Sequence, residues 1–533
     1  MWRFDEIKTL LDIPRYWARV SPDKVAIRDG RSAVTYSELE RNSNRIANRI
    51  VECGIQPGAR IGYVGRNSIE FFEIWFGACK AGCAIAPFNW RCAVPELVDM
   101  VDDAGTPLVF SEDVYSTPKM LEVKDKSAAA FELVSFNAES CSDKDLRSIH
   151  WLGGWANHVG DHNPGIKVHS DDVALLVYTS GTTGKPKGAQ YDHQAFNYSF
   201  LCMSLEPEMG WNPDDVGLMA VPNFHLGGNW VLLPALYHGA TIRTIPAFDP
   251  EAVLDAIERD SATILPLVPT ALQMLVEHPK AATTNFSSLQ RVIYFGSPIS
   301  ADVMKKAVGT LGCKLNQLYG NTETWFVTLL GHEDHLAEQS SRLASCGKAL
   351  PLIDVKICDE EGKELPVGEV GELCIRTPTI NMGYLNKPEA TAKAFHDGWY
   401  RSGDLARLDS EGFIFLVDRA KDMIVSGGEN IYSVEVERVL NLHPEVSLAA
   451  VIGIPDEKWG EKVTAFIVRA RESDVADEQF GLELIEHCRQ YLAGYKVPKE
   501  IMIQDSLPLN PTGKIQKNVL REPYWGSVNR YIR

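Results

Sequence analysis

The stretch Tyr178-Thr-Ser-Gly-Thr-Thr-Gly-Lys-Pro-Lys-Gly188 decides how this chain is interpreted. Its eleven residues include three glycines, four Ser or Thr hydroxyls and two lysines. Such a loop offers backbone N–H groups, side-chain donors and positive charge to a polyanion. The apolar run at 173–177 is typical of a strand buried on both faces, and apolar residues at 193–205 fall roughly at helical spacing. We therefore predict the order strand, glycine-rich loop, helix, with a nucleoside triphosphate bound at the loop.

The loop differs from a Walker A motif, which has four residues between its glycines and a hydroxyl after its lysine. Here two residues separate Gly181 from Gly184, and Pro186 follows Lys185. A flexible surface turn would suit the same composition. The lysine pair, the buried strand before the loop and the motifs that follow it favour a phosphate site instead.

Length and composition fit an ordinary globular protein. The 533 residues allow two to four domains, and 45% of them are hydrophobic. The net charge of −18 argues against nonspecific nucleic-acid binding and attachment to anionic lipid. No apolar run reaches the roughly 18 residues of a membrane span, and the N-terminus lacks a signal-peptide core, so we expect a cytoplasmic protein. The eleven cysteines have no framework spacing and are expected to be free thiols.

Four later segments repeat an apolar strand, a polar or glycine-rich stop and then a helix. The stops are at 222–228, 269–270, 296–298 and 319–323. Ligands of open α/β sheets bind beyond the carboxyl ends of strands, so these stops indicate one crevice.

The pattern changes further along the chain. Short alternating segments separated by turn signals predict an antiparallel β-subdomain at about 345–417. From Val434, two helices and three strands predict a small α+β domain. The expected fold is α/β, with a large N-terminal domain at 1–417 and a C-terminal domain at 418–533.

Eight motifs, in this order, resemble those of the adenylate-forming superfamily, which includes acyl-CoA synthetases, nonribosomal-peptide adenylation domains and luciferases. They are Tyr178–Gly188, Pro222–His225, Gly296–Pro298, Tyr319–Glu323, Tyr400–Asp404, Asp418–Asp422, Ser426–Asn430 and Pro511–Lys514. The resemblance covers nearly the whole chain and implies an acid:CoA ligase. In that reaction a carboxylate attacks the α-phosphate of ATP to give acyl-AMP and pyrophosphate, and a thiol, usually of coenzyme A, then displaces AMP. It also implies a small mobile lid that reorients between the two steps.

The resemblance assigns the ATP and magnesium contacts. The phosphate loop would use Thr179, Ser180, Gly181, Thr182, Thr183, Gly184 and Lys187, and the nucleotide site would also include Gly296, Ser297, Pro298, Tyr319, Gly320 and Asn321, with Tyr319 against the adenine. Thr322 would reach the α-phosphate, and Glu323 would bind Mg²⁺, a hard cation that takes oxygen ligands. Asp404, supported by Arg419, would accept hydrogen bonds from the ribose. Without the other motifs, Glu323 would suit a helix N-terminus, and Asp418 with Arg419 a surface charge pair.

The C-terminal motifs imply the lid and the coenzyme A contacts. Lys514 would act in the adenylation step by reaching the substrate carboxylate and the α-phosphate. Lys421 occupies the hinge position. Gly427 and Gly428 would let the pantetheine pass, with Glu429 and Trp459 nearby, although a tight turn and a packed tryptophan would explain the same residues.

His225 occupies the position of a movable gate beside the substrate carboxylate, although a lone histidine is more often a satisfied core residue. The resemblance implies an acyl pocket lined by Leu226, Gly227, Gly228, Trp230, Gly296, Leu318, Gly320, Trp325 and Phe326. This lining is apolar and uncharged, which favours a fatty, aryl or alicyclic acid over an amino acid.

Two other functions stay open, a ligase that loads a carrier-protein thiol and a catalytically inactive nucleotide-binding protein. A homodimer is compatible with the sequence, which does not fix the oligomeric state.

Overall fold

The computed structural model describes residues 5–136, 150–179, 186–297, 299, 301–336, 341–419, 422–426, 429–456, 459–471, 475–509 and 515–525. These fall into two compact units, the first formed by 1–354 with 375–400 and the second by 355–374 with 401–533. The domain boundary at residue 417 stays a prediction. None of the described helices is long and apolar enough to cross a membrane.

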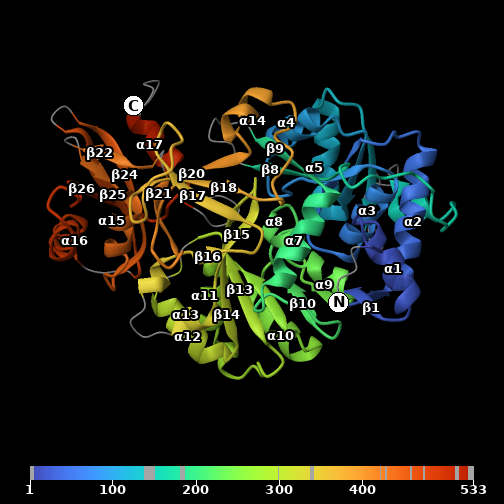
Figure 1. Ribbon diagram of the computed structural model, residues 1–533, viewed down its shortest axis with the longest axis horizontal. Helices are drawn as coiled ribbons and strands as arrows, with labels where there is room; N and C mark the ends of the chain where they lie inside the picture. The colour runs from blue at the N-terminus through green and yellow to red at the C-terminus, as the bar shows by residue number, and fades with distance from the viewer. Residues whose placement is uncertain are drawn as a thin grey trace. The chain divides into compact units, whose positions relative to one another are not determined.

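A seven-stranded sheet in the first unit carries the glycine-rich loop (Figure 1). Its strands, in spatial order, are β7 (His150–Trp151), β6 (Glu132–Phe136), β5 (Leu108–Glu112), β3 (Arg60–Val64), β4 (Ala84–Pro87), β8 (Val173–Thr179) and β9 (Lys187–Asp192). All pairs from β7 to β8 are parallel, and β9 is antiparallel to β8. The helices in this part of the chain are α2 (Tyr36–Glu52), α3 (Ile69–Lys80), α4 (Val94–Ala104), α5 (Asp113–Lys126) and α6 (Leu152–Ala156).

A nine-stranded sheet carries most of the other motifs. Its order is β16 (Lys348–Ala349), β15 (Trp325–Leu330), β14 (Lys314–Asn321), β13 (Arg291–Phe295), β12 (Ile264–Leu267), β10 (Val216–Met219), β11 (Thr241–Thr244), β1 (Val25–Arg28) and β2 (Ala33–Thr35). The helices of this part are α1 (Asp12–Val20), α7 (His193–Leu205), α8 (Leu226–Asn229), α9 (Leu233–His238), α10 (Pro250–Asp260), α11 (Pro269–Glu277), α12 (Ala301–Leu311) and α13 (His332–Leu336). Helices α10 to α12 lie beside this sheet in Figure 1, and they share one cluster of buried apolar residues with it.

One predicted strand, stop and helix unit is incomplete and another is wrong. After the glycine-rich loop the chain returns as β9, whose Lys187 and Gly188 pair with Thr179 and Tyr178 of β8. Only then does α7 begin, at the predicted His193. Likewise β14 continues to Asn321 and turns back into β15 rather than into a helix. Both loops are therefore hairpin connections, because each following segment hydrogen-bonds to the strand before it.

The predicted β-subdomain is a five-stranded sheet. It contains β17 (Asp354–Cys358), β18 (Gly371–Arg376), β20 (Trp399–Leu408) and β19 (Phe395–His396) in that order, with β21 (Ile414–Arg419) paired to β20. Helix α14 (Pro388–Ala394) precedes β19. The turn carboxylate of Asp409 accepts hydrogen bonds from the backbone N–H groups of Glu411 and Phe413, as expected for an Asx turn.

The second unit contains the predicted α+β fold. Its sheet has the order β23 (Glu429–Ile431), β22 (Ile424–Ser426), β25 (Gly460–Arg469) and β24 (Val446–Asp456), and β26 (Glu500–Ile503) pairs with β25. Helices α15 (Ser433–Leu440) and α16 (Asp477–Tyr491) share one apolar cluster with this sheet. Helix α17 (Lys517–Trp525), which the sequence analysis missed, joins a second cluster on alternate residues of β24. The sheet is therefore covered on both faces.

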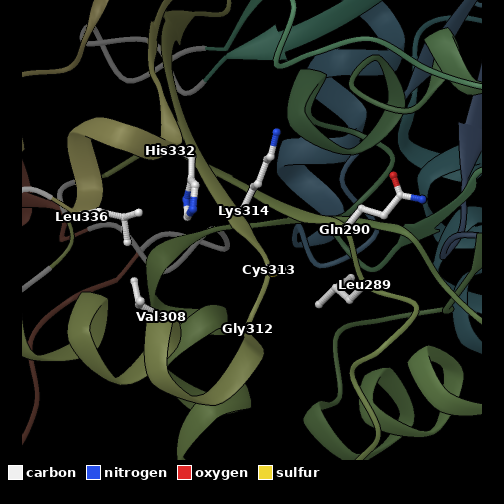
Figure 2. A pocket seen from close by; sticks show the side chains of 8 residues that line it. All are labelled: Leu289, Gln290, Val308, Gly312, Cys313, Lys314, His332 and Leu336. Atoms are coloured by element: carbon white, nitrogen blue, oxygen red, sulfur yellow. The ribbon is translucent and has the colours of Figure 1, made fainter.

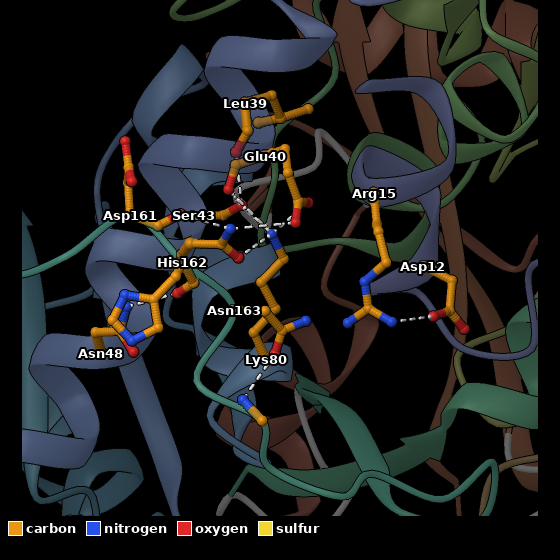
Figure 3. Close-up of polar contacts among 12 residues, drawn as sticks. Asp12, Arg15, Leu39, Glu40, Ser43, Asn48, Lys80, Asp161, His162 and Asn163 are labelled. Carbon is orange, nitrogen blue, oxygen red and sulfur yellow. Dashed lines mark hydrogen bonds and ion pairs between the residues drawn. The ribbon is translucent and has the colours of Figure 1, made fainter. Parts of the chain in front are cut away.

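A buried lysine joins three segments of the first unit (Figure 3). The Lys80 Nζ atom lies 2.5 Å from Glu40 Oε2, 2.8 Å from Ser43 Oγ and 2.7 Å from Asn44 Oδ1. The Asn44 amide in turn donates to the Asp161 carbonyl at 2.9 Å. This network ties α2 and α3 to the chain that leads into β8, and burial lowers the pKa of Lys80 to about 8.

Candidate active site

The predicted phosphate loop lies between β8 and β9. The backbones of Thr179 and Lys187 are paired at the base of the hairpin, and Lys187 Nζ lies 5.1 Å from the centroid of the Tyr384 ring. Other predicted site residues lie outside the described part of the chain, namely Ser180, Gly181, Thr182, Thr183, Gly184, Pro298, Lys421, Gly427, Gly428 and Lys514. The described ends of the hairpin therefore bring Thr179 and Lys187 next to each other, and their role at the phosphates stays a prediction.

Thr322 and Glu323 lie in the turn between β14 and β15, rather than at a helix N-terminus. The Thr324 N–H donates to the Asn321 carbonyl at 3.3 Å, and the Tyr191 hydroxyl donates to the Thr322 carbonyl. The turn is bulged at Gly320, where a Cβ atom would lie 1.9 Å from the Trp325 carbonyl oxygen. Trp325 itself has a left-handed φ of 63°. Only glycine fits position 320 without moving backbone.

The sequence analysis missed a segment that holds this turn, Thr377–Leu385. The Asn381 N–H donates to the Glu323 carbonyl at 2.9 Å, and the Thr379 hydroxyl donates to the Thr324 carbonyl at 2.8 Å. The Tyr384 hydroxyl donates to Glu323 Oε1 at 2.5 Å. Burial raises the pKa of Tyr384, and the Glu323 charge adds to this effect, so the hydroxyl keeps its proton.

The same segment also runs along the outer edge of β9. The Met382 N–H donates to the Gln190 carbonyl at 2.8 Å, the Leu385 N–H donates to the Gly188 carbonyl at 2.8 Å, and Tyr384 forms an antiparallel bridge with Ala189. Gly383, at φ 105°, is the one signal in the sequence that marks this sharp local turn. Segment 377–385 thus joins the hairpin of β8 and β9, which is the predicted phosphate hairpin, to the turn that carries Glu323.

His225 lies immediately before α8, in a loop fixed by buried asparagines. The Asn229 amide donates to the Asn223 carbonyl at 2.8 Å, and the Asn223 N–H donates to Asn67 Oδ1 at 2.9 Å. Asn67 also donates to the Val221 carbonyl at 3.0 Å, so this network connects the loop after β3 with the loop after β10. The His225 ring packs on Phe224 with centroids 4.5 Å apart.

The predicted acyl-pocket residues include a packed aromatic wall. Trp230 is fully buried and stacks between Phe196 at 3.9 Å and Trp325 at 5.7 Å, measured between ring centroids. A Cβ atom at Gly227 would lie 2.1 Å from the Phe295 ring, so this glycine lets α8 approach β13 closely. Gly296 and Ser297 follow directly after β13, with Gly296 at φ 95°.

A separate hollow lies at the other end of these strands (Figure 2). It is lined by Leu289, Gln290, Val308, Gly312, Cys313, Lys314, His332 and Leu336. Lys314 begins β14, whereas Asn321 ends it. This hollow is therefore remote from the predicted nucleotide contacts.

In the second unit, Asp404 and Arg419 face each other across β20 and β21. Arg419 Nε lies 3.1 Å from Asp404 Oδ1, and the Asp404 side chain is 8% exposed. The alternative of a surface pair between Asp418 and Arg419 is wrong, because the Asp418 carboxylate is buried and accepts a hydrogen bond from the Ser433 hydroxyl at 2.8 Å. Arg419 thus pairs with Asp404, and the role of this pair at the ribose stays a prediction.

Glu429 and Trp459 lie at the same end of β22. Ser426 pairs with Glu429 on β23 and with Gly460 on β25, next to Trp459. The Trp459 side chain is partly exposed, and its ring lies 6.0 Å from Lys499 Nζ. Trp459 is therefore not the fully packed tryptophan that was the alternative.

Two family models match the chain. One describes an AMP-binding enzyme and matches residues 15–385, and the other describes the C-terminal domain of AMP-binding enzymes and matches residues 435–514.

Relatives match along nearly the whole chain. A feruloyl-CoA synthase from Amycolatopsis is 37% identical, over 95% of this chain and 97% of its own length. A fatty acid–[acyl-carrier-protein] ligase from Streptomyces coeruleorubidus is 34% identical, over 99% of this chain and 98% of its own. The crystal structure of ATP-bound MatB from Rhodopseudomonas palustris matches with a TM-score of 0.84 and 29% identity, over 97% of this chain and 99% of that one.

Proposed function

Because this chain belongs to the AMP-binding enzyme family, we propose that it is an ATP-dependent carboxylic acid:CoA ligase that works through an acyl-adenylate. The observation that carries the proposal is the position of the turn at Glu323. Segment 377–385 hydrogen-bonds both to this turn and to the phosphate hairpin, and so links the two. The names of the relatives support an acid-thiol ligase that uses ATP and coenzyme A. In the first step the acid's carboxylate oxygen bonds to the α-phosphorus and pyrophosphate leaves. In the second step the thiolate sulfur bonds to the acyl carbon and AMP leaves.

The residues of the Glu323 turn fit a magnesium ion bound together with ATP. Glu323 offers a carboxylate, and Mg²⁺ is held in such sites by one or two carboxylates together with substrate phosphates. The side-chain Nδ2 donors of Asn321 and Asn381 are buried and lack hydrogen-bond partners in the described structure. Since unpaired buried donors are rare, a phosphate oxygen of ATP at this turn would satisfy them, while Glu323 would hold the cation. When bound, the metal would offset the negative charge that develops on the pyrophosphate.

The chain's own residues divide the remaining work. Lys187 and Thr179 would hold the phosphates, and Thr322 would reach the α-phosphate. Asp404, kept in place by Arg419, would hold the ribose, while Lys514 would act on the attacking carboxylate. Glu429 and Trp459 would flank the pantetheine of coenzyme A. Lys421 would be the hinge of the lid.

The acid is proposed to be hydrophobic, either fatty, aryl or alicyclic. Trp230, Trp325 and Phe326, among the predicted lining residues, are aromatic and uncharged, which suits such an acyl group. His225, immediately before α8, is the proposed gate. We also propose a cytoplasmic location, and a homodimer remains compatible with the structure.

One experiment tests the ligase and its runner-up. Purified protein is incubated with ATP, Mg²⁺ and a panel of fatty, aryl and alicyclic acids, and pyrophosphate release is measured. No acid-dependent release from any member of the panel would refute the enzyme and favour an inactive nucleotide-binding protein. Coenzyme A or a phosphopantetheinylated carrier protein is then added. A thioester with coenzyme A supports the proposal, whereas turnover only with the carrier supports the alternative, which the carrier-protein ligase relative keeps open.

A further inference from the structure

The Glu323 carboxylate is hydrogen-bonded to Tyr384. Among the residues that the structure describes, only the Tyr384 hydroxyl hydrogen-bonds to it, at 2.5 Å from Oε1. This is a charge-assisted hydrogen bond of the short, strong kind. It holds one of the two carboxylate oxygens, Oε1, in place.

Tyr384 is itself held from several sides. Its backbone bridges to Ala189 of β9, and its N–H donates to the Thr391 hydroxyl at 3.0 Å. Its ring packs near Phe395, with centroids 6.4 Å apart, and the residue is only 8% exposed. A hydroxyl on a fixed ring has a fixed position, so Tyr384 can fix the direction of the carboxylate it contacts.

Tyr384 also touches the phosphate hairpin. Lys187 Nζ lies over its ring, 5.1 Å from the centroid, in cation–π geometry. One side chain thus contacts both the cation predicted for the phosphates and the carboxylate predicted for the metal. This arrangement matches a site where a triphosphate and a metal bind together.

We propose that Tyr384 is a positioning residue that orients Glu323 to receive the divalent metal bound with ATP. This inference rests on the proposed function, because that function makes Glu323 the metal-binding carboxylate. Partners that orient a metal ligand in this way typically change metal affinity about 10- to 100-fold when they are removed.

The test substitutes Tyr384→Phe, which removes the hydroxyl and keeps the ring that packs on Phe395 and under Lys187. Binding of Mn²⁺, as a substitute for Mg²⁺, is measured by electron paramagnetic resonance with saturating ATP and without any acid. We expect the dissociation constant for Mn²⁺ to rise about tenfold. The matched control is Tyr36→Phe, whose buried hydroxyl donates to the Ala240 carbonyl at 2.6 Å in another part of the unit. It should leave Mn²⁺ binding unchanged.

A double-mutant cycle shows whether Tyr384 acts through Glu323. In a Glu323→Gln background, Tyr384→Phe should change Mn²⁺ binding by less than about twofold. Wild-type Mn²⁺ binding by the Tyr384→Phe single variant would overturn the proposal, and so would an undiminished tenfold effect in the Glu323→Gln background. This readout needs no acid or thiol. A wild-type protein that binds Mn²⁺ and ATP but releases no pyrophosphate with any acid would therefore refute the ligase and leave the role of Tyr384 standing.

Discussion

Gly320→Ala is expected to damage both stability and adenylation, because the new Cβ atom would strike backbone. It would lie 1.9 Å from the Trp325 carbonyl oxygen and 2.7 Å from Phe326 Cα, where ordinary contacts begin at 3.4 Å. Overpacking costs about 1–3 kcal/mol. Relief requires β15 to move by roughly 1 Å or more, which weakens adjacent hairpin hydrogen bonds at about 1 kcal/mol each. We expect the free energy of unfolding to fall by about 3 kcal/mol in total.

The same movement would displace the turn that carries Thr322 and Glu323. A misplacement of about 1 Å at a reacting centre typically costs roughly 100-fold in rate. Chemical denaturation measures the stability, and acid-dependent exchange of pyrophosphate into ATP measures adenylation at a temperature where the variant is folded.

The matched control is Gly309→Ala in α12, where a Cβ atom would meet nothing within 4 Å. Alanine should stabilise that helix by about 0.5–1 kcal/mol and leave pyrophosphate exchange unchanged. Wild-type stability and exchange rate in Gly320→Ala would refute the argument that this glycine permits the hairpin.

Three further substitutions probe other parts of the molecule. Lys80→Ala leaves the Glu40 carboxylate without its buried cation, so thermal or urea unfolding should show a loss of about 3 kcal/mol, and a change below 0.5 kcal/mol would contradict a structural role for the network. Burial lowers the pKa of His193 to about 4. Between about pH 6.5 and pH 4, His193 is therefore protonated in the unfolded chain and neutral in the folded chain. The free energy of unfolding should fall by about 3 kcal/mol as the pH falls through this window. When urea unfolding of His193→Gln is measured across this pH range, the free energy of unfolding should lack this part of the pH dependence. An unchanged pH dependence would show that other groups cause it. Lys514→Ala should abolish pyrophosphate exchange while thioester formation from supplied acyl-AMP persists; equal loss in both steps would remove its assignment to adenylation.

The sequence alone determined the chemistry and most elements of the fold. The motif from Tyr178 to Gly188, with Glu323, Asp404 and Lys514 in the same order as in the family, was enough to identify an adenylate-forming enzyme, because such residue types and spacings rarely recur together by chance. A continuous apolar run predicted β8, apolar residues before a polar stop predicted β13 and β14, and helical spacing predicted α7 from His193 to Leu205. These signals are local, so they can be seen without knowing which segments meet.

Only the tertiary structure decided what holds the site together. The strand β9 and segment 377–385 escaped the sequence analysis because their pairing partners are distant along the chain, or lie across a loop rich in glycine. Tyr384 gave no sign of its role, because its hydrogen bond to Glu323 joins residues 61 positions apart. Long-range contacts of this kind depend on which strands pair and where the chain turns. The order of residue types along one chain does not show which distant segments pair.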